Sequence, residues 1–527
     1  MSRNWFRALA FLVAVLMAIA TQLRAQAERI DTQAIQKIRD EGFNRSKVME
    51  ISSWLTDVYG ARLTGSPNLK RAADWTVGQM KTWGVSNPHL ESWGPFGRGW
   101  SNERFTAQVL EPTPYPIIAY PGAWSESTNG AQAGEVVYVK IDSEPDLAKY
   151  RGKLRGKWIM RSPAADSLPA HFRPDATRQS DSSLAAMAAR QPTPPGGGRG
   201  GAGGGRGGRG GRGNASPTWP ATLAKFWLDE GALGFLTTGP RNDDGTVFAS
   251  ATGNRQPNAE RTLPTTILAA EHYGRIYRTI TKGVPVKLEI NSQNRFYSDD
   301  LNAFNIVGEI PGTDARLKDE VVMLGAHFDS WHTGTGATDN AAGSAVMLEA
   351  MRILKTLNLP MKRTVRIGLW TGEEQGLLGS RAYVRQHFGY TDSAGPHFTP
   401  ENAKVSGYFN VDNGTGAIRG VYLQENASVG PIFKQWLEPF KDLGASTVTI
   451  SNTGGTDHQS FDAANIPGFQ FIQDGIDYNS RTHHSNMDLY ERLQTRDMMQ
   501  NAVIVAAFVY NTANRDERLP RKARTVP

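Results

Sequence analysis

The sequence contains no cysteine, and beyond its first residues it contains no long apolar run. Without thiols the protein cannot form disulfides, bind a metal through thiolates or use a cysteine nucleophile. A membrane helix needs about 20 consecutive apolar residues. The nearest approach is residues 8–20, which follow Arg3 and Arg7 and precede small residues at 25–27. This pattern predicts a signal peptide over residues 1–27 and an exported, periplasmic or extracellular protein with no membrane span after cleavage. An uncleaved anchor is the alternative.

Acidic residues are missing from the two segments in which arginines gather. The formal net charge is +7, and seven arginines account for it, three in the signal segment and four in a glycine-rich tract over residues 192–213. The remainder is close to neutral, so we expect no nucleic-acid-binding surface. The glycine- and arginine-rich composition of the tract resembles that of an RNA-binding segment. A flexible insertion is the favoured interpretation, because such a composition cannot bury apolar surface.

The length of the chain and the changes of residue pattern along it predict several domains. A chain of 527 residues exceeds one ordinary core. Residues 31–84 have a helical pattern, and short alternating runs typical of β-strands then follow. We expect a main domain formed by residues 28–115 and 293–515, an α+β module over residues 116–292 and a basic tail over residues 516–527.

The C-terminal half alternates strands with helices. Apolar runs at 321–326, 364–370, 405–411 and 469–472 predict strands, and residues 339–357 and 376–387 predict helices. Continuous apolar runs are typical of buried parallel strands. The fold class is therefore α/β, with a mostly parallel central sheet covered by helices on both faces.

Polar side chains follow each of these strands at its carboxyl end, where ligands bind in sheets of this type. The residues are His327 and Asp329, Glu373 and Glu374, Asp412, and, after a loop, His483 and His484. Taken alone, an acid such as Asp339 before a helix is usually an N-cap, and a Glu pair is usually solvated. A cluster this acidic at one edge cannot stay ionised without cations to neutralise it.

Histidines and carboxylates without thiolates are the ligands of a catalytic zinc site, with manganese or cobalt as competitors. Two histidines and at least three carboxylates exceed the set for one zinc. The sequence therefore predicts two metal ions that share a carboxylate and activate a hydroxide nucleophile, with one further carboxylate left as general base.

Five motifs together resemble the co-catalytic dizinc aminopeptidase and carboxypeptidase family. They are His327-Phe-Asp329-Ser-Trp, Gly336-Ala-Thr-Asp339-Asn, Trp370-Thr-Gly-Glu373-Glu374-Gln-Gly, Asp412 and His484-Ser-Asn-Met-Asp488. The residues within these motifs are most similar to those of the plasma glutamate carboxypeptidase branch. The resemblance covers residues 52–65 and 305–512. Residues 116–292 resemble, more loosely, the protease-associated domain that shapes substrate access in these enzymes.

The resemblance implies a role for each site residue. His327 and Asp412 would hold one zinc, Glu374 and His484 the other, and Asp339 would bridge them. Glu373 would be the general base and acid, and Asp329 would hydrogen-bond the His327 imidazole. The family's spacing selects His484 over the adjacent His483. Asp457, His458 and Asp488 remain as candidates for the substrate side; alternatively, Asp488 would support the centre near His484 as Asp329 does at His327.

The predicted function is an exopeptidase acting on peptides with a free terminus, with an aminopeptidase favoured. A dipeptidase or a glutamate-type carboxypeptidase is the alternative; a carboxypeptidase needs a cationic anchor such as Arg419 or Arg481. A glutaminyl cyclase shares the fold but would bind one zinc. A non-catalytic binding protein, similar to the transferrin receptors, would have gaps in the ligand set, and the sequence has none.

Overall fold

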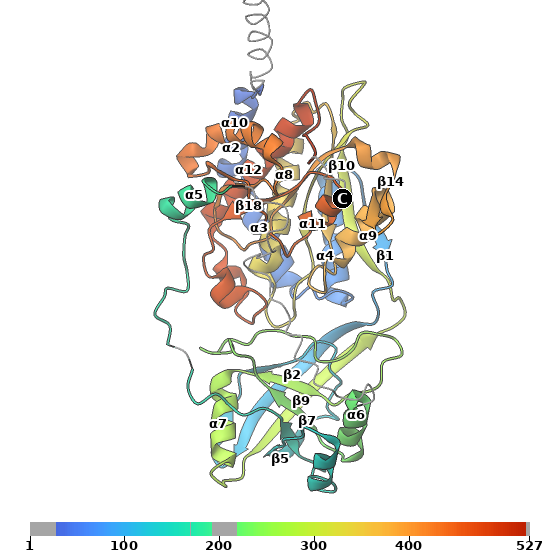
Figure 1. Cartoon of the computed structure of the whole chain (residues 1–527), viewed down its shortest axis with the longest axis vertical. Coiled ribbons are helices and arrows are strands. Elements are labelled where there is room, and N and C mark those ends of the chain that lie inside the picture. Colours follow the sequence, from blue (N-terminus) through green and yellow to red (C-terminus); the bar gives the residue numbers. More distant parts are fainter. Residues whose placement is uncertain (1–27, 169, 192–218, 523–527) are drawn as a thin grey trace, which may run out of the picture.

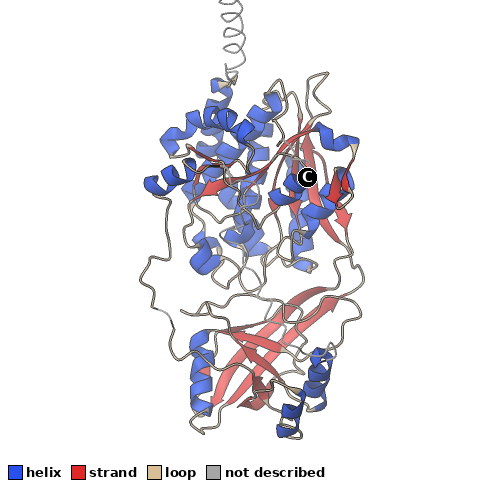
Figure 2. Ribbon diagram, in the orientation of Figure 1, coloured by secondary structure: helices blue, strands red, loops and turns tan. Residues whose placement is uncertain are grey.

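The computed structural model describes residues 28–168, 170–191 and 219–522, and its strands form two eight-stranded sheets and a small hairpin. The two sheets lie in separate parts of an elongated molecule (Figures 1 and 2). The predicted signal peptide and the glycine- and arginine-rich tract lie outside the described residues, as does the end of the tail. Among the residues that are described, no helix is long and apolar enough to cross a membrane.

The first sheet carries the strands predicted in the C-terminal half. Its central strands run parallel, whereas β10, β1 and β16 join antiparallel. The sheet is therefore mixed, with a parallel centre, in an α/β fold. In spatial order its strands are β1 (Ser86–Trp93), β10 (Ala303–Ile310), β12 (Thr364–Trp370), β11 (Val321–His327), β15 (Val405–Asn410), β18 (Gly468–Gln473), β16 (Ile418–Tyr422) and β17 (Thr447–Thr449).

Helices cover both faces of this sheet, and alternate residues of β11 explain why. Leu324 packs into one apolar core with the long helices, and Met323 packs into another on the opposite face. The helices on the first face are α2 (Thr32–Asn44), α3 (Val48–Ser53), α4 (Pro67–Thr82), α8 (Ala342–Thr356), α10 (Gly430–Leu437) and α12 (Thr495–Asn514). Those on the second are α9 (Leu378–His387) and α11 (His458–Ala463), beside the hairpin β13 (Gly389–Asp392) and β14 (Gly395–Phe398).

The second sheet takes in more of the chain than the module predicted from the sequence. Its strands, in spatial order, are β3 (Tyr115–Pro116), β2 (Gly99–Glu111), β9 (Lys287–Tyr297), β5 (Gln132–Tyr138), β6 (Trp158–Met160), β7 (Gly234–Thr237), β8 (Thr265–Leu268) and β4 (Ala119–Pro121). Strand β2 precedes the expected boundary at 116, and β9 passes the expected end at 292. The two pair with each other along most of their length. We call residues 99–297 the second-sheet region.

The helices of the second-sheet region are α5 (Asp181–Ala188), α6 (Trp219–Asp229) and α7 (Ala270–Ile280). Helices α6 and α7 bury side chains in two cores of this region, one around Trp227 and one around Trp158. Helix α5 instead lies beside the first sheet, at the end of a long loop that crosses between the two parts of the molecule (Figure 1).

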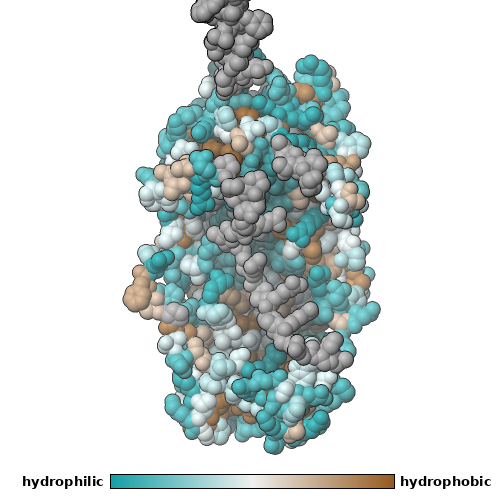
Figure 3. Space-filling view, viewed as in Figure 1, coloured by the Kyte–Doolittle hydropathy of each residue, from teal (hydrophilic) through white to brown (hydrophobic). Residues whose placement is uncertain are grey.

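Apolar side chains are turned inward in both parts of the molecule. On the face drawn in Figure 3, hydrophobic residues are scattered singly or in small groups among hydrophilic ones. Large exposed apolar side chains among the described residues include Phe172 and Val58.

Candidate metal centre

The predicted ligands meet at the carboxyl edge of the first sheet. His327 is the last residue of β11, Glu373 and Glu374 follow β12, and Asp412 follows β15. Because these three strands are parallel and adjacent, their ends bring the side chains together.

The distances divide the ligands into two sets that share Asp339. Nε2 of His327 lies 3.2 Å from Oδ1 of Asp339 and 3.3 Å from Oδ1 of Asp412. Nε2 of His484 lies 3.2 Å from the other oxygen, Oδ2, of Asp339 and 2.8 Å from Oε2 of Glu374. Each oxygen of one carboxylate thus faces a different histidine, as a ligand shared between two cations would.

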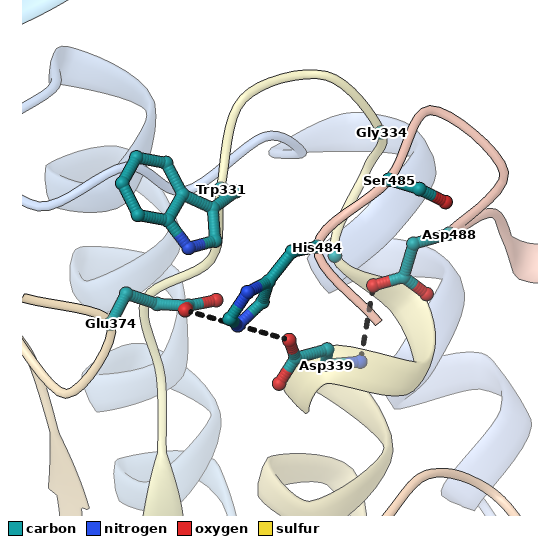
Figure 4. A pocket seen from close by; sticks show the side chains of 8 residues that line it. Trp331, Gly334, Asp339, Glu374, His484, Ser485 and Asp488 are labelled. Carbon is teal, nitrogen blue, oxygen red and sulfur yellow. Dashed lines mark hydrogen bonds and ion pairs between the residues drawn. The ribbon is translucent and has the colours of Figure 1, made fainter. Parts of the chain in front are cut away.

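The geometry also separates His484 from its neighbour. Nε2 of His483 lies 3.8 Å from Oδ2 of Asp339, and the ring packs against Tyr478 with 4.7 Å between centroids. Only His484 of the two pairs with Glu374 among the described residues. Figure 4 shows His484 directed between Glu374 and Asp339. His483 is also close enough to form a candidate metal-ligand group with Asp339 and His484.

Buried oxygens in this cluster have no hydrogen-bond partner among the described residues. They are Oδ2 of Asp339, both carboxylate oxygens of Glu374 and Oδ1 of Asp412. Burying a carboxylate without donors is costly. Burial, together with the negative charge of Asp339, raises the pKa of Glu374 well above its ordinary value. Cations would satisfy these oxygens, and imidazole and carboxylate ligands fit zinc.

Asp339 is held by contacts that the sequence did not reveal. Its backbone is not helical (φ −132°, ψ 83°), so α8 begins at Ala342 instead of the predicted residue 339. The Tyr478 hydroxyl donates to Oδ1 of Asp339 at 3.0 Å. The N-cap position of α8 is Ala341, and Oδ1 of the preceding Asn340 accepts the Gly343 N–H at 2.8 Å.

Asp488 also acts on Asp339. Its two carboxylate oxygens accept the backbone N–H groups of Thr338 at 2.6 Å and of Asp339 at 3.1 Å. The side chain is buried, and burial together with the charge of Asp339 raises its pKa to about 7. With its oxygens turned to the backbone, Asp488 is placed to position Asp339, and it also borders the smaller of the two hollows described below, so its place on the substrate side stays a prediction.

Asp329 contacts His327 chiefly through its backbone. Nδ1 of His327 lies 3.0 Å from the carbonyl oxygen of Asp329 and 3.6 Å from its carboxylate. The carboxylate instead accepts a hydrogen bond from the Thr64 hydroxyl at 2.8 Å and from the Glu373 N–H at 3.3 Å. Asp329 thus contacts the imidazole through its carbonyl oxygen, and its carboxylate anchors the turn that carries Glu373 and Glu374.

The carboxyl of Glu373 lies in a desolvated and negatively charged environment. Burial raises its pKa well above the ordinary value; the charge of His327 opposes this shift, and those of Asp412 and Asp457 reinforce it. Among the described residues, no ion pair within 4.0 Å occupies the Glu373 carboxyl, in contrast to Glu374. A buried carboxyl whose protonated form is favoured in this way is a candidate for proton transfer.

Two candidates for the substrate side lie behind the centre. Asp457 is fully buried, and burial raises its pKa to about 7. Nε2 of His458 lies 3.1 Å from the Thr453 carbonyl oxygen and 3.0 Å from Nε2 of Gln424. Burial lowers the pKa of His458 to about 4. Neither residue lines the two hollows described below, so their place on the substrate side stays a prediction.

Arg62 supports the segment before Asp339, and no local sequence pattern singles it out. The guanidinium is fully buried and donates to the carbonyl oxygens of Leu55, Phe328, Thr335 and Gly336 at 2.8–3.0 Å. Desolvation lowers its pKa to about 10, although nearby carboxylates favour the charged form.

Two hollows adjoin the ligands. The smaller, of about 10 Å³, is bordered by Trp331, Asp339, Glu374 and His484 (Figure 4) and has room for about one water-sized body. The larger, of about 620 Å³, reaches from Glu374 to the second-sheet region. The second-sheet region contributes Trp124, Asn254, Arg255 and Gln256 to its border. The part of the chain that forms the first sheet contributes Trp331 and Gln375.

Comparisons with known proteins agree with this arrangement. Residues 305–509 match the model of peptidase family M28. Carboxypeptidase Q of Mus musculus is 25% identical over 93% of this chain and 90% of the mouse protein. The crystal structure of a peptidase M28 precursor from Shewanella amazonensis has a TM-score of 0.63 at 22% identity, covering 93% of this chain and 99% of that one.

A zinc aminopeptidase from Bacillus subtilis has the same fold, with a TM-score of 0.51 at 18% identity over 89% of this chain and 95% of the other. The family match spans the strands and loops that carry all five predicted ligands. The part of the chain that carries the predicted ligands therefore matches peptidase family M28, and the chain is a metallo-exopeptidase.

Proposed function

We propose that this chain is an exopeptidase with two zinc ions, most simply an aminopeptidase. One observation carries the proposal. The two oxygens of Asp339 face two separate histidines, and each histidine has its own second carboxylate, Asp412 or Glu374. A complete ligand set of this kind also argues against a binding protein that has lost catalysis.

In this proposal His327 and Asp412 hold one zinc, Glu374 and His484 hold the other, and Asp339 is shared. Zinc bound there would polarise the scissile carbonyl and lower the pKa of water to about 7. Tyr478 and Asp488 would fix Asp339 through its carboxylate and its backbone N–H. Manganese or cobalt remain possible substitutes for such ligands.

Glu373 is the proposed general base and acid. Its burial and raised pKa favour a carboxyl that takes a proton from the attacking water and passes it to the leaving amine. Asp329 would hold Glu373 in place by accepting its backbone N–H, in addition to directing the His327 ring. The proton therefore stays close to the scissile bond throughout the reaction.

The larger hollow is the proposed substrate cleft. Its border includes Glu374, and the Trp331 and Trp124 rings lie on the same border, with 6.4 Å between ring centroids. A peptide terminus bound in this cleft would lie beside the metal ligands. Neither anchor expected for a carboxypeptidase is available, since Arg419 contacts Gly444 and Asp474 and Arg481 contacts Asp175.

A second candidate, a dipeptidase or a glutamate-type carboxypeptidase, is favoured by Arg255. This arginine borders the cleft, stacks 4.5 Å from the Phe96 ring and donates to the Phe96 carbonyl oxygen. Within the described parts of the chain it forms no ion pair, so its charge is available to a carboxylate of the substrate. The relatives named carboxypeptidase Q, which match nearly the full chain, agree with this candidate.

Di- and tripeptides with free, acetylated or amidated ends separate the two candidates. An aminopeptidase loses activity when the amino end is acetylated and keeps it when the carboxyl end is amidated. If Arg255 anchors a carboxylate, Arg255→Ala should raise KM about tenfold or more for free peptides and leave amidated ones unchanged, because a charged hydrogen bond contributes about 1.5–3 kcal/mol. Arg295→Ala, at an exposed arginine near Glu103, is the matched control.

The number of zinc ions per chain distinguishes a peptidase from the remaining enzyme candidate, a glutaminyl cyclase. Two zinc ions per chain in the purified protein support peptide hydrolysis, whereas one would revive the glutaminyl cyclase interpretation. Deleting residues 192–213 should leave peptidase activity unchanged; salt-sensitive RNA binding that disappears with the tract would favour nucleic-acid binding instead.

Export is also part of the proposal. It rests on the basic and apolar pattern of residues 1–27 in a chain without cysteine. The mass of the mature N-terminus, measured on protein from the periplasm or the medium, should correspond to cleavage near residue 27. A mature protein that begins at Met1 and sediments with membranes would indicate an uncleaved anchor.

A further inference from the structure

The segment that carries His484 is fastened from two sides by the second-sheet region. It runs from Asp474, just after β18, to Asn486, and we call it the ligand segment. One fastening is the arm, residues 171–190, which leaves the second-sheet region and lies along the first sheet (Figure 1). The other is a loop over residues 241–249, which we call the clamp loop. Neither belongs to the metal centre itself.

The arm contacts the ligand segment through both backbone and side chains. Thr177 and Ile476 exchange two backbone hydrogen bonds, of 2.9 and 2.7 Å. The carboxylate of Asp175 pairs with the Arg481 guanidinium, and its carbonyl oxygen accepts from the Ser480 hydroxyl at 2.8 Å. These contacts surround Tyr478, whose hydroxyl reaches Asp339.

Arg178 ties the beginning of the ligand segment to a helix. Its Nη1 donates to Oδ2 of Asp474 at 2.8 Å and to Oδ2 of Asp497, in α12, at 2.7 Å. The backbone N–H of Gln179 donates to the other oxygen of Asp474 at 2.8 Å. The carboxylate of Asp474 is almost fully buried, so these donors stabilise a charge that would otherwise be poorly solvated.

The clamp loop contacts the ligand segment at His484 itself. The N–H of Ala249 donates to the His484 carbonyl oxygen at 2.7 Å, and Asn486 exchanges hydrogen bonds of 2.6 and 3.1 Å with Val247. His484 has a positive φ of 65°, which non-glycine residues seldom adopt. A histidine in that conformation keeps it only when its surroundings hold it there.

The arm and the clamp loop are also joined to each other. Nε2 of His171, in the arm, lies 3.1 Å from Oδ2 of Asp243, in the clamp loop. The two fastenings therefore enclose the ligand segment as one unit that originates in the second-sheet region, although the ligands themselves all come from the first.

We propose that the arm and the clamp loop position His484, so that the second-sheet region sets the affinity of the zinc bound by Glu374 and His484. Asp175 and Arg178 are positioning residues in this scheme. The inference rests on the proposed two-zinc function. Residues that orient metal ligands typically change metal affinity by about 10–100-fold when they are replaced.

Zinc affinity of the whole protein, measured by competition with a chromophoric chelator, tests the proposal without an activity assay. Arg178→Ala and Asp175→Asn should each weaken one of the two zinc ions about tenfold and leave the other unchanged. The weakened zinc should be the one lost in His484→Ala. Arg190→Ala is the matched control, because Arg190 lies in the same arm and contacts Ser451, outside the ligand segment.

Hydrogen exchange of the zinc-free variants provides a second measurement. In Arg178→Ala the amides of residues 474–486 should exchange faster, while those of β11 and β12 exchange as in the parent protein. Two bound zinc ions with unchanged affinities in both variants would overturn the proposal. Fewer than two zinc ions in the parent protein would instead overturn the two-zinc function on which it rests.

Discussion

The two sheets of this molecule have the same number of strands but differ in the residues at the carboxyl ends of their parallel strands. In the first, the parallel strand β11 ends at His327, and Glu373 and Asp412 lie three and two residues after the ends of β12 and β15. In the second, the three residues after β6 and after β7 include no histidine or carboxylate, and the carboxylate that follows β8, Glu271, belongs to helix α7. A parallel sheet therefore provides an edge at which ligands can gather, and the residues placed there decide whether it becomes a reactive centre.

The second-sheet region contributes by contact instead. It supplies Arg255 and Trp124 to the border of the cleft, and it holds the ligand segment through the arm and the clamp loop. We expect substitutions at the strand ends of the first sheet to abolish peptide hydrolysis. Substitutions in the second-sheet region should instead change zinc or substrate affinity, or the stability of the fold. The following experiments test that division, in order of their expected effect on turnover.

Asp339→Asn should have the largest effect. It replaces one oxygen of the carboxylate whose two oxygens face His327 and His484 with an amide nitrogen that cannot bind a cation. Zinc should be lost from both sets of ligands, and turnover should fall to background. Metal content after dialysis and hydrolysis of a dipeptide are the measurements, with Asp392→Asn, at an exposed turn, as control. Retention of both zinc ions with normal turnover would contradict the shared-ligand assignment.

Glu373→Gln should lower turnover by about 10²–10⁴-fold while both zinc ions stay bound, because a general base is lost but no ligand is. Its neighbour provides the comparison, since Glu374→Gln should lose zinc from the His484 side. Metal content and single-substrate kinetics measured on the two variants distinguish them. Loss of zinc from Glu373→Gln and its retention in Glu374→Gln would mean that the two residues have exchanged roles.

Asp488→Asn should weaken zinc binding and turnover by about 10–100-fold, the range for residues that orient ligands. The amide leaves one of the N–H groups of Thr338 and Asp339 without an acceptor. Asp314→Asn is a matched control, because Asp314 also accepts two backbone N–H groups but in an exposed turn. Equal effects in the two variants, measured by chelator competition, would rule out a specific role for Asp488.

The sequence predicted the first region better than the second for a physical reason. Buried strands there are continuous apolar runs that end at a histidine or an acid, as at His327 and Asp412, so local pattern and chemistry coincide. Strand β2 has many exposed or half-exposed residues and no such run, so the sequence pattern does not predict that the second sheet begins before residue 116.

Residues whose roles depend on distant partners could not be assigned. Asp175 and Arg481 are 306 positions apart, and no local pattern in the arm predicts that they pair. His458 lies in a motif near the centre, but the direction of its side chain depends on how α11 packs. Asp488 was selected for its spacing from His484, whereas the backbone it holds is that of Asp339.

The smallest effect on turnover is expected from a core substitution in the second sheet region. Ile276 and Ile353 are both fully buried, the first in α7 and the second in α8. Replacing either with alanine should lower the free energy of unfolding by about 2–5 kcal/mol. Ile276→Ala should leave turnover and zinc affinity of the folded protein unchanged, because α7 carries no ligand. In Ile353→Ala the loosened helix begins next to Asp339, so zinc affinity should fall as well. Equal losses of zinc affinity in both variants, measured below their unfolding temperatures, would mean that the core of the second sheet is as tightly coupled to the metal ligands as α8 is.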